Sequence, residues 1–579
     1  MTTLLTPAAG PGAATATSRP PARRTTRDLS LVVIVTVVSL ILAAIVGLPL
    51  LRIFSVAFSA EGWEVVSSML TNPVNRRILW NTVQLGVLVA VIGTAVGFVL
   101  AYAQVRLKFR GKRIVHLIAL IPIVSPPFAI ATATISLFGR NGLITNGLLG
   151  IQSDIYGLNG LTMVLVISFF PVAYMNLKGM LESLDPSLDE ASANLGASKL
   201  RTFLTVTVPM LIPGIAGSVL LLFVESISDL GNPLVLGGDY TVLASRAYIA
   251  ITGEYSVASG AAYSVVLLVP ALSVFLIQRY WVGRKNVVTV TGKPTGTTQL
   301  ITTPVLRIPA LFVTFLTCGL VVILYLTVLG GGFVKILGVN NEFTWSHFQF
   351  VLSGIGSDAM FTTTTLALIA TPIAGLLGML IAWLVVRKLK RTAGLMDFVG
   401  MLGLAVPGTV IGIGYAIAFN TPTVIAGRQW FPAVAGGSAM FGGAVAIIMV
   451  FVARSLPSGQ RSGISALGQI SPAIDEASTS LGASAATTFR RVTLPLIRPA
   501  LLAGLTYAFA RSMTTLSPII FITTPQTKIM TSQILAEVDA GRFGNAFAYC
   551  SILILIVLGV IGVLNLALLH PSFRGVGRR

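Results

Sequence analysis

Long apolar runs separated by short polar loops occupy most of the chain. Each run is close to the ~20 residues that an α-helix needs to cross a bilayer, and the pattern predicts twelve spans, six in each half. The expected spans are 30–57, 80–105, 113–138, 160–182, 210–232, 260–282, 305–330, 363–387, 395–419, 436–456, 496–520 and 547–570. The predicted fold class is therefore an all-α polytopic membrane protein with two homologous six-helix halves.

The segments outside these runs differ from them in composition. Residues 1–28 are rich in Ala, Thr, Pro and Gly and end in a basic cluster, so we expect a disordered tail. Residues 29–282 and 305–570 are the two expected transmembrane domains. A polar linker at 283–304 joins them, and a basic tail follows at 571–579. The first apolar run is far longer than a signal-peptide core, which predicts an uncleaved first helix.

Composition and charge fit this picture. Of 579 residues, 54% are hydrophobic and only 10% are charged, whereas a soluble domain has about 25% charged residues. The net charge of +20 would suit a nucleic-acid-binding protein. Most of the basic residues, however, fall in alternate short loops, which is the pattern of cytoplasmic loops. The sequence therefore predicts a lipid bilayer as the partner rather than nucleic acid, with both termini and the linker in the cytoplasm.

The sequence offers no residues for catalysis or metal binding. Cys318 and Cys550 both lie in apolar runs, and the three histidines are too far apart in sequence to suggest a metal site. No Ser–His–Asp or Cys–His pattern stands out. We therefore expect no enzyme activity and no cofactor bound by this chain.

A polar stretch between two apolar runs occurs twice. Residues 185–213 read DPSLDEASANLGASKLRTFLTVTVPMLIP, and residues 471–499 read SPAIDEASTSLGASAATTFRRVTLPLIRP. One offset of 286 aligns Asp189, Glu190, Ala191, Gly196, Ala197, Phe203 and Pro209 with Asp475, Glu476, Ala477, Gly482, Ala483, Phe489 and Pro495. Because a bilayer-spanning helix needs only apolar residues, these matches indicate a duplicated functional element.

Each copy predicts a helix, a turn and a second helix on the cytoplasmic face. Asp185 and Ser471 are good N-cap residues. Gly196 and Gly482 suit a turn in which other residues would be strained. The proline at 209 or 495 is then expected to mark the start of the next span.

The duplication extends beyond these loops. At an offset of 281, Arg106 aligns with Arg387 and Pro126 with Pro407. Six spans return the chain to the same side of the membrane, so the two halves should be parallel repeats related by an axis along the membrane normal.

Charged residues inside spans are expensive and usually functional. Glu225 and Asp229 lie in the fifth expected span, with Asn232 close behind, and Glu225 aligns with Arg511, the only base that the sequence places clearly within a span. We hypothesise that Glu225 and Arg511 meet as an ion pair between the halves and that Glu225, Asp229, Asn232 and Arg511 line or gate a pathway. A purely structural polar contact is an equal alternative.

The repeated pattern EAS-x3-GAS-x4-F-x5-P resembles the "EAA" motif of the membrane subunits of binding-protein-dependent ABC importers, although Ser192 and Ser478 replace its third residue. The resemblance implies a type I importer in which the fourteen aligned residues couple the membrane domains to ATP hydrolysis. It also implies two copies of an ATPase subunit, which hold ATP-Mg, and an external solute-binding protein. The chain itself has no G-x-x-x-x-G-K-[ST] phosphate loop.

The stretch from Asp229 to Pro233 also resembles a segment of iron and phosphonate permeases, and the fused halves resemble the ferric-iron, 2-aminoethylphosphonate and thiamine branch. The expected solute is ferric iron, with 2-aminoethylphosphonate, thiamine or a polyamine as alternatives. Iron ligands would have to come from the binding protein or a chelator. An ion-coupled secondary transporter is the alternative class, and a membrane-bound enzyme or scaffold is a third that lacks candidate catalytic groups.

Overall fold

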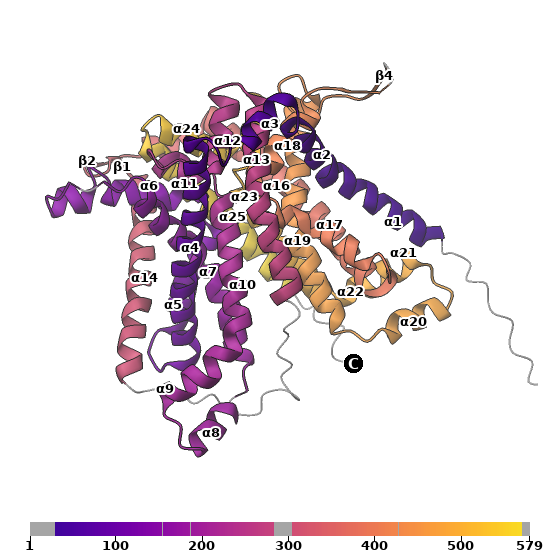
Figure 1. Ribbon diagram of the computed structural model, residues 1–579, viewed down its shortest axis with the longest axis horizontal. Coiled ribbons are helices and arrows are strands. Elements are labelled where there is room, and N and C mark those ends of the chain that lie inside the picture. The colour runs from indigo at the N-terminus through magenta and orange to yellow at the C-terminus, as the bar shows by residue number, and fades with distance from the viewer. Residues whose placement is uncertain (1–28, 153, 186, 283–303, 426–427, 570–579) are drawn as a thin grey trace, which may run out of the picture.

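The structure, a computed structural model, describes residues 29–152, 154–185, 187–282, 304–425 and 428–569, most of which are helical. The expected tails and almost all of the expected linker lie outside these ranges. Figure 1 shows long helices packed side by side, with the two repeated loops at one end of the molecule and short helices and two hairpins at the other. Both repeated loops therefore lie on the same side, as parallel repeats require.

Within the described ranges, nine helical segments are long and apolar enough to cross a membrane. Three bent helix pairs bring the number to twelve, which agrees with the sequence. The nine are α1–α2 (Leu29–Leu42 and Leu48–Ala57), α4 (Pro73–Arg106), α7 (Leu158–Ser183), α10 (Val208–Ser228), α13 (Val257–Ile277), α14 (Pro304–Gly331), α16 (Ile355–Trp383), α19 (Ala444–Gly468) and α25 (Phe543–Leu569).

The third span of each half is bent, where the sequence predicted one helix over 113–138 and one over 395–419. In the first half, α5 (Lys112–Val124) and α6 (Pro127–Phe138) belong to a pair that is bent by 107°. In the second half, α17 (Ala393–Ala405) and α18 (Gly408–Phe419) meet at 100°. The chain is extended at Pro126 and Pro407 and at the residue before each. A proline disfavours helical geometry in the preceding residue, so the aligned prolines bend both spans.

The fifth spans differ between the halves. In the first half, α9 (Lys199–Thr202) continues through a π turn (Phe203–Thr207) into α10, and Pro209 lies at its start, as predicted. In the second half, the corresponding segment is broken. Its first part comprises α21 (Ala485–Thr488), a π turn (Phe489–Thr493) and α22 (Leu494–Leu496), and the chain bends by 82° between this part and α23 (Arg498–Thr514). The expected start at Pro495 is therefore wrong, because the chain leaves helical geometry at Ile497.

Both fifth spans also end early, so their predicted limits of 232 and 520 are wrong. After α10 the chain is extended at Asp229 and then forms the short helix α11 (Gly231–Leu236). After α23 it is extended at Thr515 and then forms a 3-10 turn at Ile519–Phe521. The two halves thus break their fifth spans at corresponding places.

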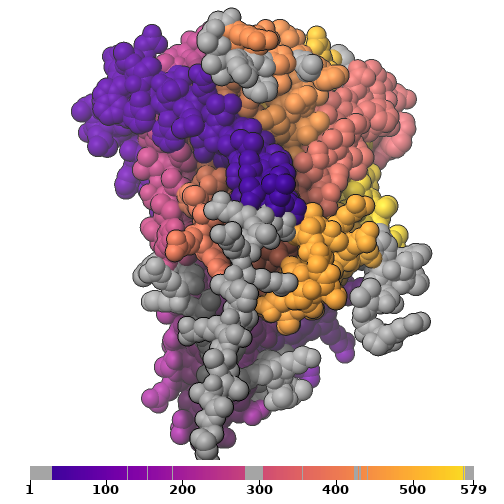
Figure 2. All heavy atoms as spheres, turned by 90° about the vertical axis from the view of Figure 1, so that its right-hand side faces the viewer, coloured from indigo at the N-terminus to yellow at the C-terminus, as the bar shows by residue number. Residues whose placement is uncertain are grey.

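The first span of each half packs on the other half. Helix α2 contacts α18, and α1 contacts α17 and α21, whereas α14 contacts α4, α5 and α6. Figure 2 shows the indigo N-terminal helix lying across the orange segments of the second half. A π turn at Ala43–Gly47 interrupts this first span. The hydroxyl of Tyr415 on α18 donates a hydrogen bond of 2.6 Å to the carbonyl oxygen of Ile45 within that turn. Each half is therefore completed by a helix of the other.

Short elements cap the end opposite the repeated loops. They comprise α3 (Ala60–Ser67), α12 (Leu243–Thr252), α15 (Ser346–Leu352), α24 (Met530–Asp539), and two antiparallel hairpins, β1 (Val334–Ile336) with β2 (Asn340–Phe343) and β3 (Thr423–Ile425) with β4 (Arg428–Phe431).

Helices α12 and α24 are a further part of the duplication that the sequence reading missed. The first amide of α12, at Leu243, donates to Thr82 Oγ1 at 2.8 Å, and the first amide of α24, at Met530, donates to Thr363 Oγ1 at 2.8 Å. Each threonine hydroxyl satisfies an N–H that the helix leaves free. The same bond thus joins equivalent helices at the same end of both halves.

Candidate functional site

From the first loop helix to the π turn, the two repeated loops have the same secondary structure, residue for residue. The first helices are α8 (Ser187–Asn194) and α20 (Ala473–Ser480), and the second are α9 and α21. Asp185 accepts a hydrogen bond from the amide of Ser187 at 2.9 Å, and Ser471 accepts one from Ala473 at 3.4 Å. In the second loop, however, α20 begins at Ala473 and its N-cap is Pro472, so Ser471 lies one residue before the N-cap position that was predicted for it.

The glycine turns are as predicted. Gly196 has φ of +79° and Gly482 has φ of +86°, a region that residues with a side chain rarely adopt. Two residues after each glycine, a serine (Ser198 or Ser484) caps the second helix by accepting an amide hydrogen bond at 3.3 Å. A sharp turn between two capped helices results in both loops.

A hydroxyl pair closes each loop. Ser192 Oγ lies 2.7 Å from Thr202 Oγ1, and Ser478 Oγ lies 2.9 Å from Thr488 Oγ1. These serines replace the third residue of the motif, and the alanine that they replace has no hydroxyl with which to form this bond. These hydroxyl partners were not predicted from the sequence, because both threonines lie ten positions further along the chain.

Aromatic contacts anchor both loops to the second span of their own half. The ring centroid of Phe203 lies 5.1 Å from that of Tyr102 on α4, and that of Phe489 lies 5.2 Å from that of Trp383 on α16. The motif phenylalanine therefore links the second loop helix to a membrane helix.

An arginine beside this contact holds the second loop. Arg387 Nε lies 3.2 Å from Asp475 Oδ2, and the two side chains are only 8% and 12% exposed. Thr493 donates to the other carboxylate oxygen at 2.9 Å, and Arg387 also donates to the carbonyl oxygens of Leu467 and Ile470 at the end of α19. In the first half Arg106 is buried as well, and the side chain of Asp189 lies outside the described part of the structure.

Replacing Arg387 with glutamine is expected to loosen the second loop. Removing one partner of a buried ion pair costs ~3–5 kcal/mol, because Asp475 would keep a buried charge without a counter-charge. We expect faster protease cleavage between α19 and α20 in membranes. The double variant Arg387→Gln with Asp475→Asn should recover part of the resistance, and equal cleavage of wild type and single variant would contradict the anchoring role.

The faces of the loops that point away from the membrane helices carry exposed apolar side chains. Leu195 and Leu481 are each 89% exposed at aligned positions, and Leu188 and Ile474 are also exposed. Other motif residues are exposed with them, namely Glu190, Ala191, Glu476 and Ala477, whereas Ala197 and Ala483 are partly buried. The same apolar positions are thus exposed in both copies of the loop, next to exposed motif residues.

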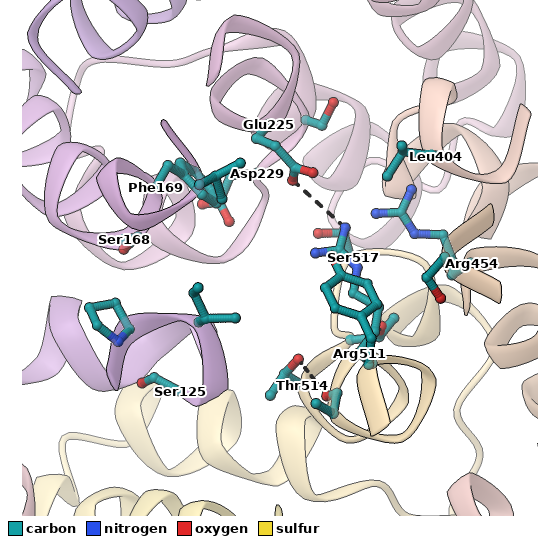
Figure 3. A pocket seen from close by; sticks show the side chains of 18 of the residues that line it. Ser125, Ser168, Phe169, Glu225, Asp229, Leu404, Arg454, Arg511, Thr514 and Ser517 are labelled. Atoms are coloured by element: carbon teal, nitrogen blue, oxygen red, sulfur yellow. Dashed lines mark hydrogen bonds and ion pairs between the residues drawn. The ribbon is translucent and has the colours of Figure 1, made fainter. Parts of the chain in front are cut away.

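The predicted pathway residues line a cavity of about 540 Å³ between the two halves. Its walls come from α5, α7 and α10 of the first half and α17, α19 and α23 of the second. Figure 3 shows Glu225 and Arg511 pointing toward each other, and their Oε2 and Nη2 atoms lie 3.7 Å apart. The structure thus brings together the pair that the repeat alignment suggested.

Asp229 and Asn232 lie deeper in the wall. Asp229 Oδ2 accepts hydrogen bonds from the backbone amide of Asn232 at 2.9 Å and from its Nδ2 at 3.0 Å, so the carboxylate caps α11. The Oδ1 atom of Asn232 is buried without a hydrogen-bond partner. Asp229 therefore has a structural task in addition to lining the cavity.

Two further arginines line the cavity, which corrects the prediction that Arg511 is alone. Arg454 and Arg461 were assigned to a cytoplasmic loop, because the apolar run weakens near residue 456, but α19 continues to Gly468 and carries both along the cavity wall. Arg454 Nη1 donates hydrogen bonds to the carbonyl oxygens of Gly403 and Val406 at 3.0 Å each. It thereby supplies hydrogen-bond donors to carbonyl groups at the end of α17, where the helix bends.

No group of three or more His, Cys, Asp or Glu side chains that would hold a metal ion occurs among the described residues. The cavity instead offers guanidinium groups, two carboxylates and several hydroxyl groups. This chemistry suits transient binding of a polar solute.

The chain matches the family model "Binding-protein-dependent transport system inner membrane component" twice, over residues 93–287 and 374–575. The chain belongs to this family. Each match covers one repeated loop and one wall of the cavity. Membership establishes a multi-pass inner-membrane permease of the ABC importer type, with the membrane fold duplicated in one chain.

Individual relatives extend the likeness to most of the chain. "Ferric transport system permease protein FbpB" of Actinobacillus pleuropneumoniae is 34% identical over 505 residues, which cover 84% of this chain and 70% of the relative. "Putative ferric transport system permease protein FbpB 1" of Haemophilus influenzae is 34% identical over 486 residues, 80% of this chain and 73% of the relative. "Probable sulfate transport system permease protein cysT" of Helicosporidium is 28% identical over 233 residues, 40% of this chain and 86% of the relative.

Proposed function

We propose that this chain is the membrane-spanning subunit of an ATP-driven importer that carries ferric iron into the cytoplasm. Three relatives that match four-fifths or more of the chain are named as ferric or Fe(3+) transport permeases. The chain supplies both halves of the pathway and performs no chemistry on the solute.

Two copies of an ATPase subunit bind the chain, one at each repeated loop. The observation that carries this proposal is the pair of exposed leucines, Leu195 and Leu481, at aligned positions of two loops of the same geometry. ATP-Mg is held by these partners. Closure of the ATPase pair moves the loops, and the anchors at Phe203 and Phe489 pass this movement to the membrane helices.

The chain lies in a bacterial cytoplasmic membrane with both termini and both repeated loops in the cytoplasm. A solute-binding protein docks at the opposite face, where α12 and α24 lie. Support comes from α1, which contacts α21 of the second loop, and Figure 1 shows the N-terminal end of α1 beside that loop. A reporter protein fused after residue 28 should lie in the cytoplasm, and one fused after residue 255 should lie on the opposite side of the membrane.

Uptake of radioactive iron tests the solute. Cells that lack their own ferric uptake should accumulate iron only when the chain, its ATPase and its binding protein are all present. Collapsing the proton gradient while ATP is maintained should leave the rate unchanged, whereas an ion-coupled secondary transporter would stop. Uptake of 2-aminoethylphosphonate, thiamine or a polyamine, with no uptake of iron, would replace iron as the solute.

A further inference from the structure

Five charged side chains line the cavity, and its two carboxylates are already engaged. Glu225 pairs with Arg511, and Asp229 accepts two hydrogen bonds from Asn232. Among the described residues, no carboxylate lies within ion-pair distance of Arg454 or Arg461. The cavity therefore has an excess of positive charge, and α19 carries it.

Arg454 and Arg461 lie along one face of α19. They are seven residues apart, which is close to two helical turns or about 10.5 Å along the axis. Ser458 and Ser462 line the same wall. The aligned positions of the first half are Ser168 and Met175, so the basic face belongs to the second half alone.

Arg461 is available for a solute. Its side chain is exposed, and within the part of the chain that the structure describes it forms no ion pair. Asp397, on the neighbouring α17, is already paired with Arg279 through an Nη2–Oδ2 contact of 2.6 Å and accepts a further hydrogen bond from Gln460. Arg454 is held by carbonyl oxygens, but its Nε is buried without a partner.

A bare ferric ion does not suit this wall. Fe³⁺ would meet three guanidinium groups against only two carboxylates, Glu225 and Asp229, so the net charge around it would be positive and would repel it. Arginine instead pairs strongly, and often through two hydrogen bonds, with oxyanions such as carboxylates and phosphates. The charge of the wall selects for a solute that presents anionic oxygen atoms.

We propose that iron crosses this cavity as an anionic complex, in which small oxyanions hold the ferric ion and their outer oxygen atoms bind Arg461 and Arg454. This proposal rests on ferric iron as the solute. Cavities of ~300–1,000 Å³ hold compact small-molecule ligands, so about 540 Å³ accepts a ferric ion with one or two polycarboxylate ligands.

Equilibrium dialysis of the purified full-length chain tests the site directly, with ferric citrate as the probe. Wild type should bind it saturably, and Arg461→Gln should weaken binding by about tenfold or more, because a charge-assisted pair is lost. Arg77→Gln removes one positive charge at the opposite end of the molecule and should bind like wild type. Arg461→Gln is the main variant because Arg454 also caps α17. An absence of saturable binding, or equal binding by Arg461→Gln, would overturn the proposal.

Double-label uptake separates this inference from the proposed function. With the complete transporter, radioactive iron and radioactive citrate should enter together at a fixed ratio, and Arg461→Gln should lower both. Entry of iron without any oxyanion would overturn the anionic complex and leave the ferric permease intact. Entry of citrate without iron would instead refute ferric iron as the solute while supporting the anion site.

Discussion

Replacing both Gly196 and Gly482 with valine is expected to abolish transport. The variant should also lose its ATPase partner, although it should still insert in the membrane. Both glycines have positive φ, a conformation that costs other residues about 1–2 kcal/mol and β-branched ones more. An added Cβ would meet no atom within 4 Å at either position. The cost therefore falls on the backbone of the turn, which must rearrange and displace the exposed leucine beside it. Co-purification with the ATPase and initial uptake rates measure the effect.

Gly111 provides a matched control. It has φ of +86°, it also has no atom within 4 Å of an added Cβ, and it precedes α5 at the same end of the molecule. Gly111→Val should therefore carry the strain of one such glycine without touching a repeated loop, and it is compared with Gly196→Val and Gly482→Val made singly. If it loses transport equally, the effect is general destabilisation. Wild-type transport by the double glycine variant would refute the coupling role of the loops.

Reversing the charge of Glu225 or Arg511 alone is expected to lower transport by about tenfold or more, equivalent to ~1.4 kcal/mol in an effective barrier. Glu225→Arg places two cations, and Arg511→Glu two anions, where the present charges are 3.7 Å apart. The double reversal restores opposite charges and should recover most of the lost rate. Initial uptake rates at equal membrane abundance measure this.

The pair Arg140–Asp154 is the control for the charge reversal. Its atoms are 2.9 Å apart, but both side chains are mainly exposed and lie away from the cavity. Exposed ion pairs contribute little, so reversing them singly or together should leave transport unchanged. A Glu225–Arg511 double reversal that inserts normally but regains no transport would count against a pathway role for the ion pair.

The sequence predicted the fold class, the twelve spans and the repeated loops because each rests on local chemistry. Apolar length identifies a span, and a glycine at a fixed place in two copies identifies a turn. The alignment of Glu225 with Arg511 predicted a contact between the halves, because parallel repeats place equivalent positions across one axis. The functional roles assigned to these residues remain predictions.

Some features were not predicted although part of their signal is local. The aligned prolines Pro126 and Pro407 mark the two bends, but the groups that satisfy the broken helix ends, such as Arg454, come from another span. Arg461 was missed because hydropathy marks where apolar residues stop, not where a helix ends. The partners of Ser192 and Ser478 are set by how the loop folds back, which spacing alone does not reveal.

The exchanged first spans have a consequence for how the protein is made. Helix α1–α2 emerges from the ribosome long before its partner α18, which ends at Phe419. At ~5–20 residues per second, the first span waits for tens of seconds in the bilayer before Tyr415 reaches the Ile45 carbonyl. During that time its π turn faces lipid, so biogenesis of this chain should depend on membrane chaperones more than that of a permease whose halves close independently.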